Sequence, residues 1–135
     1  MKIVTAVKYA HEISHRLHEV KGDIITPLGD REGVKVNQVW VFGSTVKGSL
    51  SPNDLDLLID LSGYGKIFRP PERPQAKTPA WAKHYNMCRS SRELALVWLT
   101  RGMKNVSRHL VGEEEVEIDV MQMIYPHFEA RFPQL

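Results

Sequence analysis

The sequence has few of the features that mark a secreted, membrane-spanning or disulfide-stabilised protein. Its 135 residues include one cysteine, Cys88, which excludes an internal disulfide framework and favours a reducing compartment. The longest wholly apolar run, Leu94 to Leu99, is too short to span a bilayer, and no signal peptide is recognisable at the start. We therefore expect a cytoplasmic protein with no membrane attachment.

A strong charge imbalance and a P-loop are also missing. The formal net charge is +2 at pH 7, which does not by itself imply a nucleic-acid partner. The pattern Gly-x-x-x-x-Gly-Lys-Ser/Thr occurs nowhere in the chain, so P-loop chemistry is excluded. The length, with 42% apolar and 25% charged residues, predicts one globular domain over residues 1–135.

The most informative part of the sequence is residues 39–60. An apolar segment is followed by a short polar turn, and a second apolar segment opens with two carboxylates, Asp54 and Asp56. Because side chains alternate between the two faces of a strand, these carboxylates should project side by side. At about 5 Å they would repel by about 3 kcal/mol at an effective dielectric of about 20, so a cation should lie between them. Oxygen ligands favour Mg²⁺ or Mn²⁺.

The turn before these carboxylates has the composition of a phosphate-binding loop. Gly43 has no Cβ, so its backbone can lie against a bulky anion. Ser44 stands where a strand becomes a short helix, and it offers a hydroxyl and the free N–H groups of a helix start. Lys47 adds a positive charge one turn later. A phosphate site opposite a metal-binding carboxylate pair favours phosphoryl or nucleotidyl transfer.

A plainer interpretation of the same residues is a β-hairpin with a Gly-Ser-rich connection and two solvent-facing aspartates. Asn53 and Asp54 can begin a turn. Turn chemistry does not require a second aspartate two residues later, nor an apolar strand that runs directly into Gly-Ser. The pattern therefore favours the metal-and-phosphate interpretation.

Residues 42–44 (Phe-Gly-Ser), nine further residues and then residues 54–57 (Asp-Leu-Asp-Leu) resemble the signature of the DNA polymerase β-like nucleotidyltransferase superfamily. Small bacterial members often read Gly-Ser-x-Ala-Arg-Gly. This chain has Gly-Ser-Thr-Val-Lys-Gly at residues 43–48, with lysine where arginine is usual. The family uses a third carboxylate on a later strand, and Asp119, in an apolar alternating context, fits that role.

The resemblance implies an α+β nucleotidyltransferase (polymerase β-like) core, in which a mixed β-sheet is backed by helices. It implies transfer of NMP from an NTP such as ATP to a hydroxyl acceptor, by a two-metal mechanism that releases pyrophosphate. The metal ligands and catalytic residues would be Asp54, Asp56 and Asp119. The nucleotide-binding residues would be Gly43, Ser44 and Lys47.

The acceptor stays open at this point, because the chain is too short for the extra domains of larger relatives. A partner protein, a nucleic acid such as RNA and a small molecule are all compatible with the pattern. The alternative from another functional class is a non-catalytic nucleotide-binding or protein-interaction module on the same fold, acting as an antitoxin or regulatory subunit.

Periodicity predicts the elements around this core. We expect an amphipathic helix over residues 3–21, strands over 34–42 and 54–61, and a second helix over 79–103 whose apolar second half is largely buried. Residues 106–111 and 116–124 indicate a hairpin, which would bring Asp119 to the cleft of the other two aspartates.

Two further features suggest either function or solvation. Residues 63–79 form a basic, proline-rich insertion, which is either a surface loop or an arm that contacts a polyanion. His11, His15 and His18 form a stripe on the first helix. Their spacing is compatible with a metal site, but they lie far from the apolar stripe, so a solvated face is the preferred interpretation.

Overall fold

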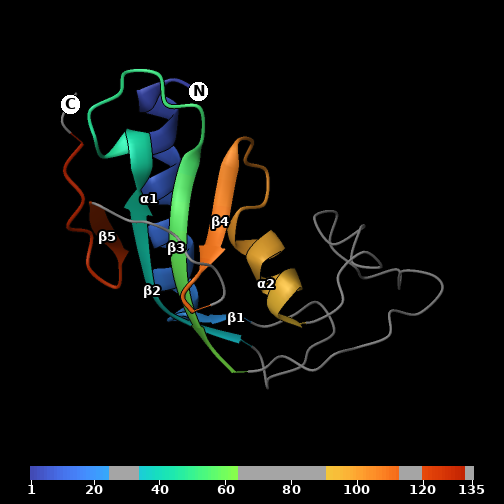
Figure 1. The fold of residues 1–135 in the computed structure, drawn as a ribbon. Coiled ribbons are helices and arrows are strands. Elements are labelled where there is room, and N and C mark those ends of the chain that lie inside the picture. The colour runs from blue at the N-terminus through green and yellow to red at the C-terminus, as the bar shows by residue number, and fades with distance from the viewer. Residues whose placement is uncertain (25–33, 64–90, 113–119, 133–135) are drawn as a thin grey trace, which may run out of the picture.

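The computed structural model describes residues 1–24, 34–63, 91–112 and 120–132. Its elements, in chain order, are α1 (Ile3–Val20), β1 (Asp23–Ile24), β2 (Val34–Phe42), the 3₁₀ turn η1 (Gly43–Thr45), β3 (Leu55–Ser62), α2 (Ser91–Leu99), β4 (Val106–Leu110) and β5 (Met121–Tyr125). The strands form one mixed five-stranded sheet, so the described residues have an α+β architecture (Figure 1).

β2 and β3 are the central strands of the sheet. They pair antiparallel from Lys35↔Ser62 to Phe42↔Asp56, with η1 in the connection between them. On the far side of β3, β4 pairs in parallel. On the far side of β2, β1 pairs with its first residues and β5 with its last, both antiparallel. The end of β2 therefore lies beside the start of β3, as the sequence predicted.

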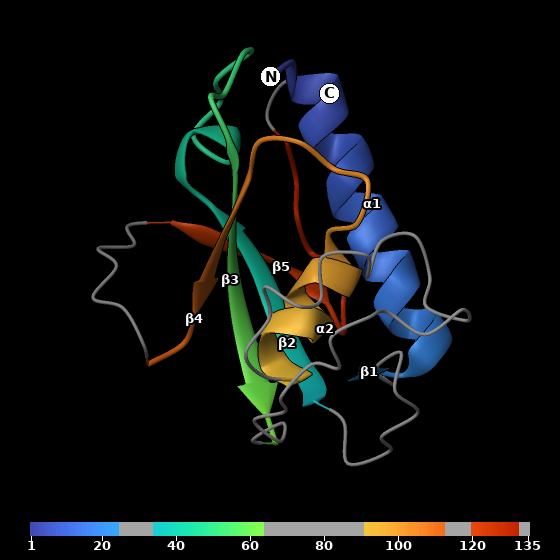
Figure 2. The same cartoon turned by 90° about the vertical axis from the view of Figure 1, so that its right-hand side faces the viewer.

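Both described helices, α1 and α2, lie on one side of the sheet, and no described helix covers its other side (Figure 2). The core between helices and sheet is built from α1 residues at helical spacing and from alternate strand residues. Its fully buried large side chains include Ile13, Leu17, Val39, Leu55, Leu57 and Ile59. Neither described helix combines the length and hydrophobicity that a bilayer crossing needs.

A shift of register in β2 explains why its apolar residues do not alternate strictly. Val34 and Val36 are buried, and so are Val39 and Val41, although the spacing between the two pairs is three residues. The pairing with β3 shifts between Val36 and Gln38, and such a bulge turns the following side chains back to the buried face.

Three expectations for the elements are confirmed within the described residues. The first helix and the strand before the Gly-Ser turn have the predicted bounds to within one residue. The second strand begins at Leu55, so Asp54 lies just before it. The basic proline-rich insertion of residues 63–79 lies outside the described residues apart from Gly63, as does the predicted start of the second helix.

Two expectations are wrong. The hairpin of residues 106–111 with 116–124 does not form, because β4 pairs with β3 and β5 pairs with β2, on opposite sides of the central strands. The second helix ends at Leu99 rather than near Met103, since the next N–H groups bond three residues back, from Arg101 to Trp98 and from Met103 to Thr100.

The second half of α2 is also less buried than expected. Ala95 and Leu99 are buried, whereas Leu96, Val97 and Trp98 are only partly covered. Only one stripe of α2 is therefore buried against the rest of the protein. The apolar composition of the segment does not reveal how many of its sides are covered.

Candidate functional site

The carboxylate of Asp56 stands directly over the backbone of the Gly-Ser turn. Asp56 is the register partner of Phe42, so the two residues share the face of the sheet that no described helix covers. Gly43 follows with φ of 76°, and a Cβ placed on it would lie 2.5 Å from Oδ2 of Asp56. Position 43 therefore requires glycine for two reasons: its backbone is left-handed, and the Asp56 carboxylate occupies the space of a Cβ.

Asp54 is held from two directions. The Ser107 hydroxyl on β4 donates to its Oδ2 at 3.3 Å. The buried Thr45 hydroxyl in η1 donates to its backbone carbonyl at 3.5 Å. The next residue, Leu55, donates its N–H to the carbonyl of Asn105 at 2.9 Å. The start of β3 is thus tied both to the Gly-Ser turn and to the strand on its other side.

The environment of Asp56 favours its protonated form. Burial raises the pKa of its carboxyl, the nearby His109 partly offsets this, and the charge of Asp54 raises it further. His109 Nε2 lies 3.9 Å from Oδ1 of Asp56, which is an electrostatic contact rather than a hydrogen bond. The imidazole is itself positioned edge-on against the Phe42 ring, with centroids 5.3 Å apart.

The remaining two turn residues that the sequence assigned to nucleotide binding lie at the same end of β2. Ser44 is exposed within η1, and Lys47 is exposed just after it. The N–H groups of Val46 and Lys47 both bond to the carbonyl of Gly43 at 3.2 Å, so the turn is closed by its own backbone. The Ser44 and Lys47 side chains are thus exposed on the turn whose first residue, Gly43, lies against the Asp56 carboxylate.

The donor set fits a hard divalent cation in part. Two carboxylates from one strand segment face the side of the sheet that no described helix covers, and burial, with a smaller contribution from the charge of Asp54, raises the pKa of Asp56. Among the residues that the structure describes, no group of three or more Asp, Glu, His or Cys side chains could hold a metal ion. The third expected ligand, Asp119, lies outside the described residues.

No family model, curated protein or solved structure matches this chain. The functional interpretation consequently depends on the residues themselves and on the sequence signature that they form.

The histidine stripe of α1 does not form a comparable site. His11 stacks on Phe128 with ring centroids 4.1 Å apart, and His15 Nε2 lies 3.0 Å from the Glu19 carboxylate one turn later. His18 packs at 5.0 Å against the Tyr125 ring. Each imidazole has its own neighbour, so the stripe serves packing and the helix surface.

Sequence reasoning missed two residues of the carboxylate site. It predicted no role for Ser107, and it treated Thr45 only as a variable position of the Gly-Ser turn. The place of Ser107 follows from the parallel pairing of β4 with β3, which sets it opposite Asp56, and the place of Thr45 follows from the turn η1, which brings its hydroxyl to the Asp54 carbonyl. The sequence predicted a strand over residues 106–111 but carried no signal for its partner.

Proposed function

We propose that this protein is a metal-dependent nucleotidyltransferase with a polymerase β-like core. The observation that carries the proposal is the pair Asp54 and Asp56 at the start of a strand, with the second carboxylate packed on Gly43 of a Gly-Ser turn. The order helix, strand, Gly-Ser turn, carboxylate strand and later strands supports the same assignment.

The proposed reaction transfers NMP from an NTP to a hydroxyl acceptor. The acceptor oxygen forms a bond to the α-phosphorus, the bond from that phosphorus to the bridging oxygen breaks, and pyrophosphate leaves with the electron pair. The acceptor proton passes to a carboxylate or to water. Bound Mg²⁺ or Mn²⁺ would supply charge neutralisation for the phosphates and lower the pKa of the attacking hydroxyl.

The residues of the chain have separate roles in this proposal. Asp54 and Asp56 hold the cations, and Asp119 would provide the third carboxylate. Ser44 and the backbone of Gly43 bind the terminal phosphates, and Lys47 adds positive charge beside them. The Ser107 hydroxyl fixes the orientation of the Asp54 carboxylate through its 3.3 Å hydrogen bond.

Transfer of label from α-³²P-labelled NTPs tests the proposal. Each NTP is incubated with the protein and Mg²⁺ or Mn²⁺, and with RNA, protein extract or a mixture of small hydroxyl compounds as acceptor. We expect label in one acceptor class, with loss of all transfer in Asp56→Ala because the phosphate charge is then uncompensated.

Asp60→Ala is the matched control. Asp60 lies on the same strand and the same face, four residues further along, where it pairs with Gln38. This variant should keep full transfer. Full transfer by Asp56→Ala would refute the mechanism, and absence of transfer from any NTP would favour the non-catalytic module.

A further inference from the structure

The residues from the end of α2 through β4 carry an excess of positive charge. Residues 100–112 contain Arg101, Lys104, Arg108 and His109 and no acidic residue. The whole chain carries a net charge of only +2, and five of the next seven residues, 113–119, are acidic, so the positive charge is confined to residues 100–112. The same residues include Ser107, whose hydroxyl donates to Asp54 in the carboxylate site.

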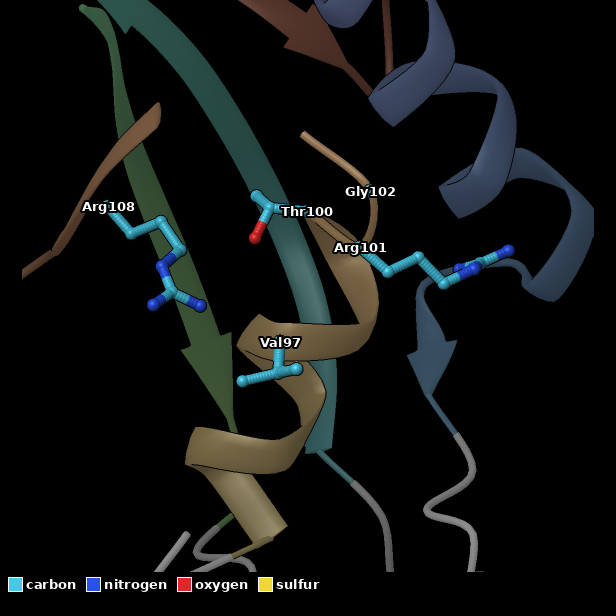
Figure 3. Close-up of a pocket in the computed structure, with 5 residues that line it drawn as sticks. All are labelled: Val97, Thr100, Arg101, Gly102 and Arg108. Atoms are coloured by element: carbon cyan, nitrogen blue, oxygen red, sulfur yellow. The ribbon is translucent and has the colours of Figure 1, made fainter. Parts of the chain in front are cut away.

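A cavity of about 270 Å³ lies between the end of α2 and β4, lined by Val97, Thr100, Arg101, Gly102 and Arg108. Figure 3 shows Arg108 extending from β4 toward α2 and Val97 pointing into the same space, while the Arg101 side chain runs the opposite way. Arg101 donates to the Trp98 carbonyl at 3.0 Å and lies over the Trp98 ring at 4.6 Å. Of the two described arginines that line the cavity, Arg108 is therefore the one whose side chain extends into it.

Arg108 is an exposed side chain, and within the described residues it has no hydrogen-bond or ion-pair partner. It is the register partner of Leu57, so it lies on the helix-covered face of the sheet. Its neighbours Ser107 and His109 lie on the other face, beside Asp54 and Asp56. Among the described strands β4 pairs with β3 alone, so it is an edge strand with a cation on one face and the site on the other.

We propose that this cavity binds a backbone phosphate of a single-stranded polynucleotide acceptor, which passes over the β4 edge to bring its terminal hydroxyl to the carboxylates. The inference rests on the proposed function and names its acceptor class. A guanidinium binds phosphate oxygens in bidentate fashion. The apolar wall at Val97 suits the sugar or base attached to that phosphate, and exposed Lys104 adds a second positive charge in the connection before β4.

Binding without turnover tests this. Fluorescence anisotropy is measured with RNA and DNA oligonucleotides of about 12 nucleotides, in EDTA and without NTP, at about 50 mM salt and above. We expect Arg108→Ala to weaken binding by about tenfold or more, the effect of removing one charge-assisted phosphate interaction. The slope of log affinity against log salt should become shallower by about 0.7, the value for neutralising one phosphate of a single strand.

Two variants control this comparison. Arg131→Ala removes an equally exposed arginine beside β5, at the other edge of the sheet, and should leave affinity and salt slope unchanged. Arg108→Lys keeps the charge and should retain the slope while binding more weakly than the wild type. Thermal melting of each variant confirms that it is folded. Preference for RNA or DNA identifies the acceptor.

The outcomes separate this inference from the proposed function. Equal binding by Arg108→Ala and Arg131→Ala, or no binding by the wild type at about 50 mM salt, overturns the inference. The inference is also overturned if the label is transferred to a protein or a small molecule and Arg108→Ala transfers it as well as the wild type does. The proposed function survives that result. Binding that depends on Arg108 without any transfer supports the polynucleotide site and counts against the transferase.

Discussion

The two faces of β3 differ in what covers them, and the difference separates stability from chemistry. On one face, Leu55, Leu57 and Ile59 are completely buried under the helices. On the other face, Asp56 keeps 26% of its side chain exposed. One short strand thus supplies both the centre of the core and the centre of the candidate site, because successive side chains point to opposite faces.

This arrangement explains how a small domain can carry a cluster of like charges. The carboxylates are attached to a strand that the core already fixes, so their positions do not depend on attraction between them. Burial on the opposite face offsets the repulsion between Asp54 and Asp56. We expect changes on the covered face to alter stability and changes on the open face to alter metal and nucleotide binding.

The largest effect on stability should come from Leu57→Ala. Leu57 has no exposed surface, and truncating such a leucine costs about 2–5 kcal/mol through reduced burial and a residual cavity. The matched control is Leu58→Ala, one residue along on the partly exposed open face, where we expect about 1 kcal/mol or less. Urea unfolding measures both. Equal destabilisation would show that the two faces are equally covered in solution.

A smaller destabilisation is expected for Gly43→Ala. Forcing alanine to φ of 76° costs about 1–2 kcal/mol, and its Cβ would displace the Asp56 carboxylate. Gly102→Ala is the control, because Gly102 has φ of 78° with no atom within 4 Å of the added Cβ.

The two glycine variants should therefore differ in metal binding more than in backbone strain. We expect Mg²⁺ to raise the thermal midpoints of the wild type and of Gly102→Ala. The thermal midpoint of Gly43→Ala should stay unchanged when Mg²⁺ is added. An unaltered Mg²⁺ response in Gly43→Ala would separate the glycine from the carboxylate site.

The smallest effect on stability is expected for Asp56→Asn in the absence of metal, and this substitution should stabilise the protein. The raised pKa means that the folded state keeps the Asp56 proton to higher pH than the unfolded state does. The free energy of unfolding therefore falls as pH rises through that window, and the penalty persists at neutral pH. Below the unfolded pKa of about 3.9 both states are protonated and the penalty vanishes.

Asp56→Asn removes this penalty. In EDTA the variant should be more stable than the wild type near neutral pH, and equally stable near pH 3. Saturating Mg²⁺ should reverse the order by stabilising only the wild type, by about 2.7 kcal/mol at 100 times Kd. A variant that is less stable than the wild type in EDTA would mean that the carboxylate makes a favourable contact in the metal-free protein.

Local signals in the sequence predicted much of the fold. The spacing of apolar residues in 3–20 indicated the first helix, and Gly-Ser followed by Asp-Leu-Asp-Leu indicated the strand, turn and strand in antiparallel order. These features are readable because each depends on residues within about ten positions of one another. The pairing of β4 and β5 depends on distant partners, and it was predicted wrongly.

The order of residues along the chain was enough to place two aspartates on one face of a strand next to a Gly-Ser turn, since side chains alternate along an extended backbone. Which side chains meet those aspartates depended on the folded chain, because strand pairing selects neighbours that are distant in sequence. Parallel pairing of β4 with β3 brings Ser107 and His109 to the carboxylates and sets Arg108 on the opposite face.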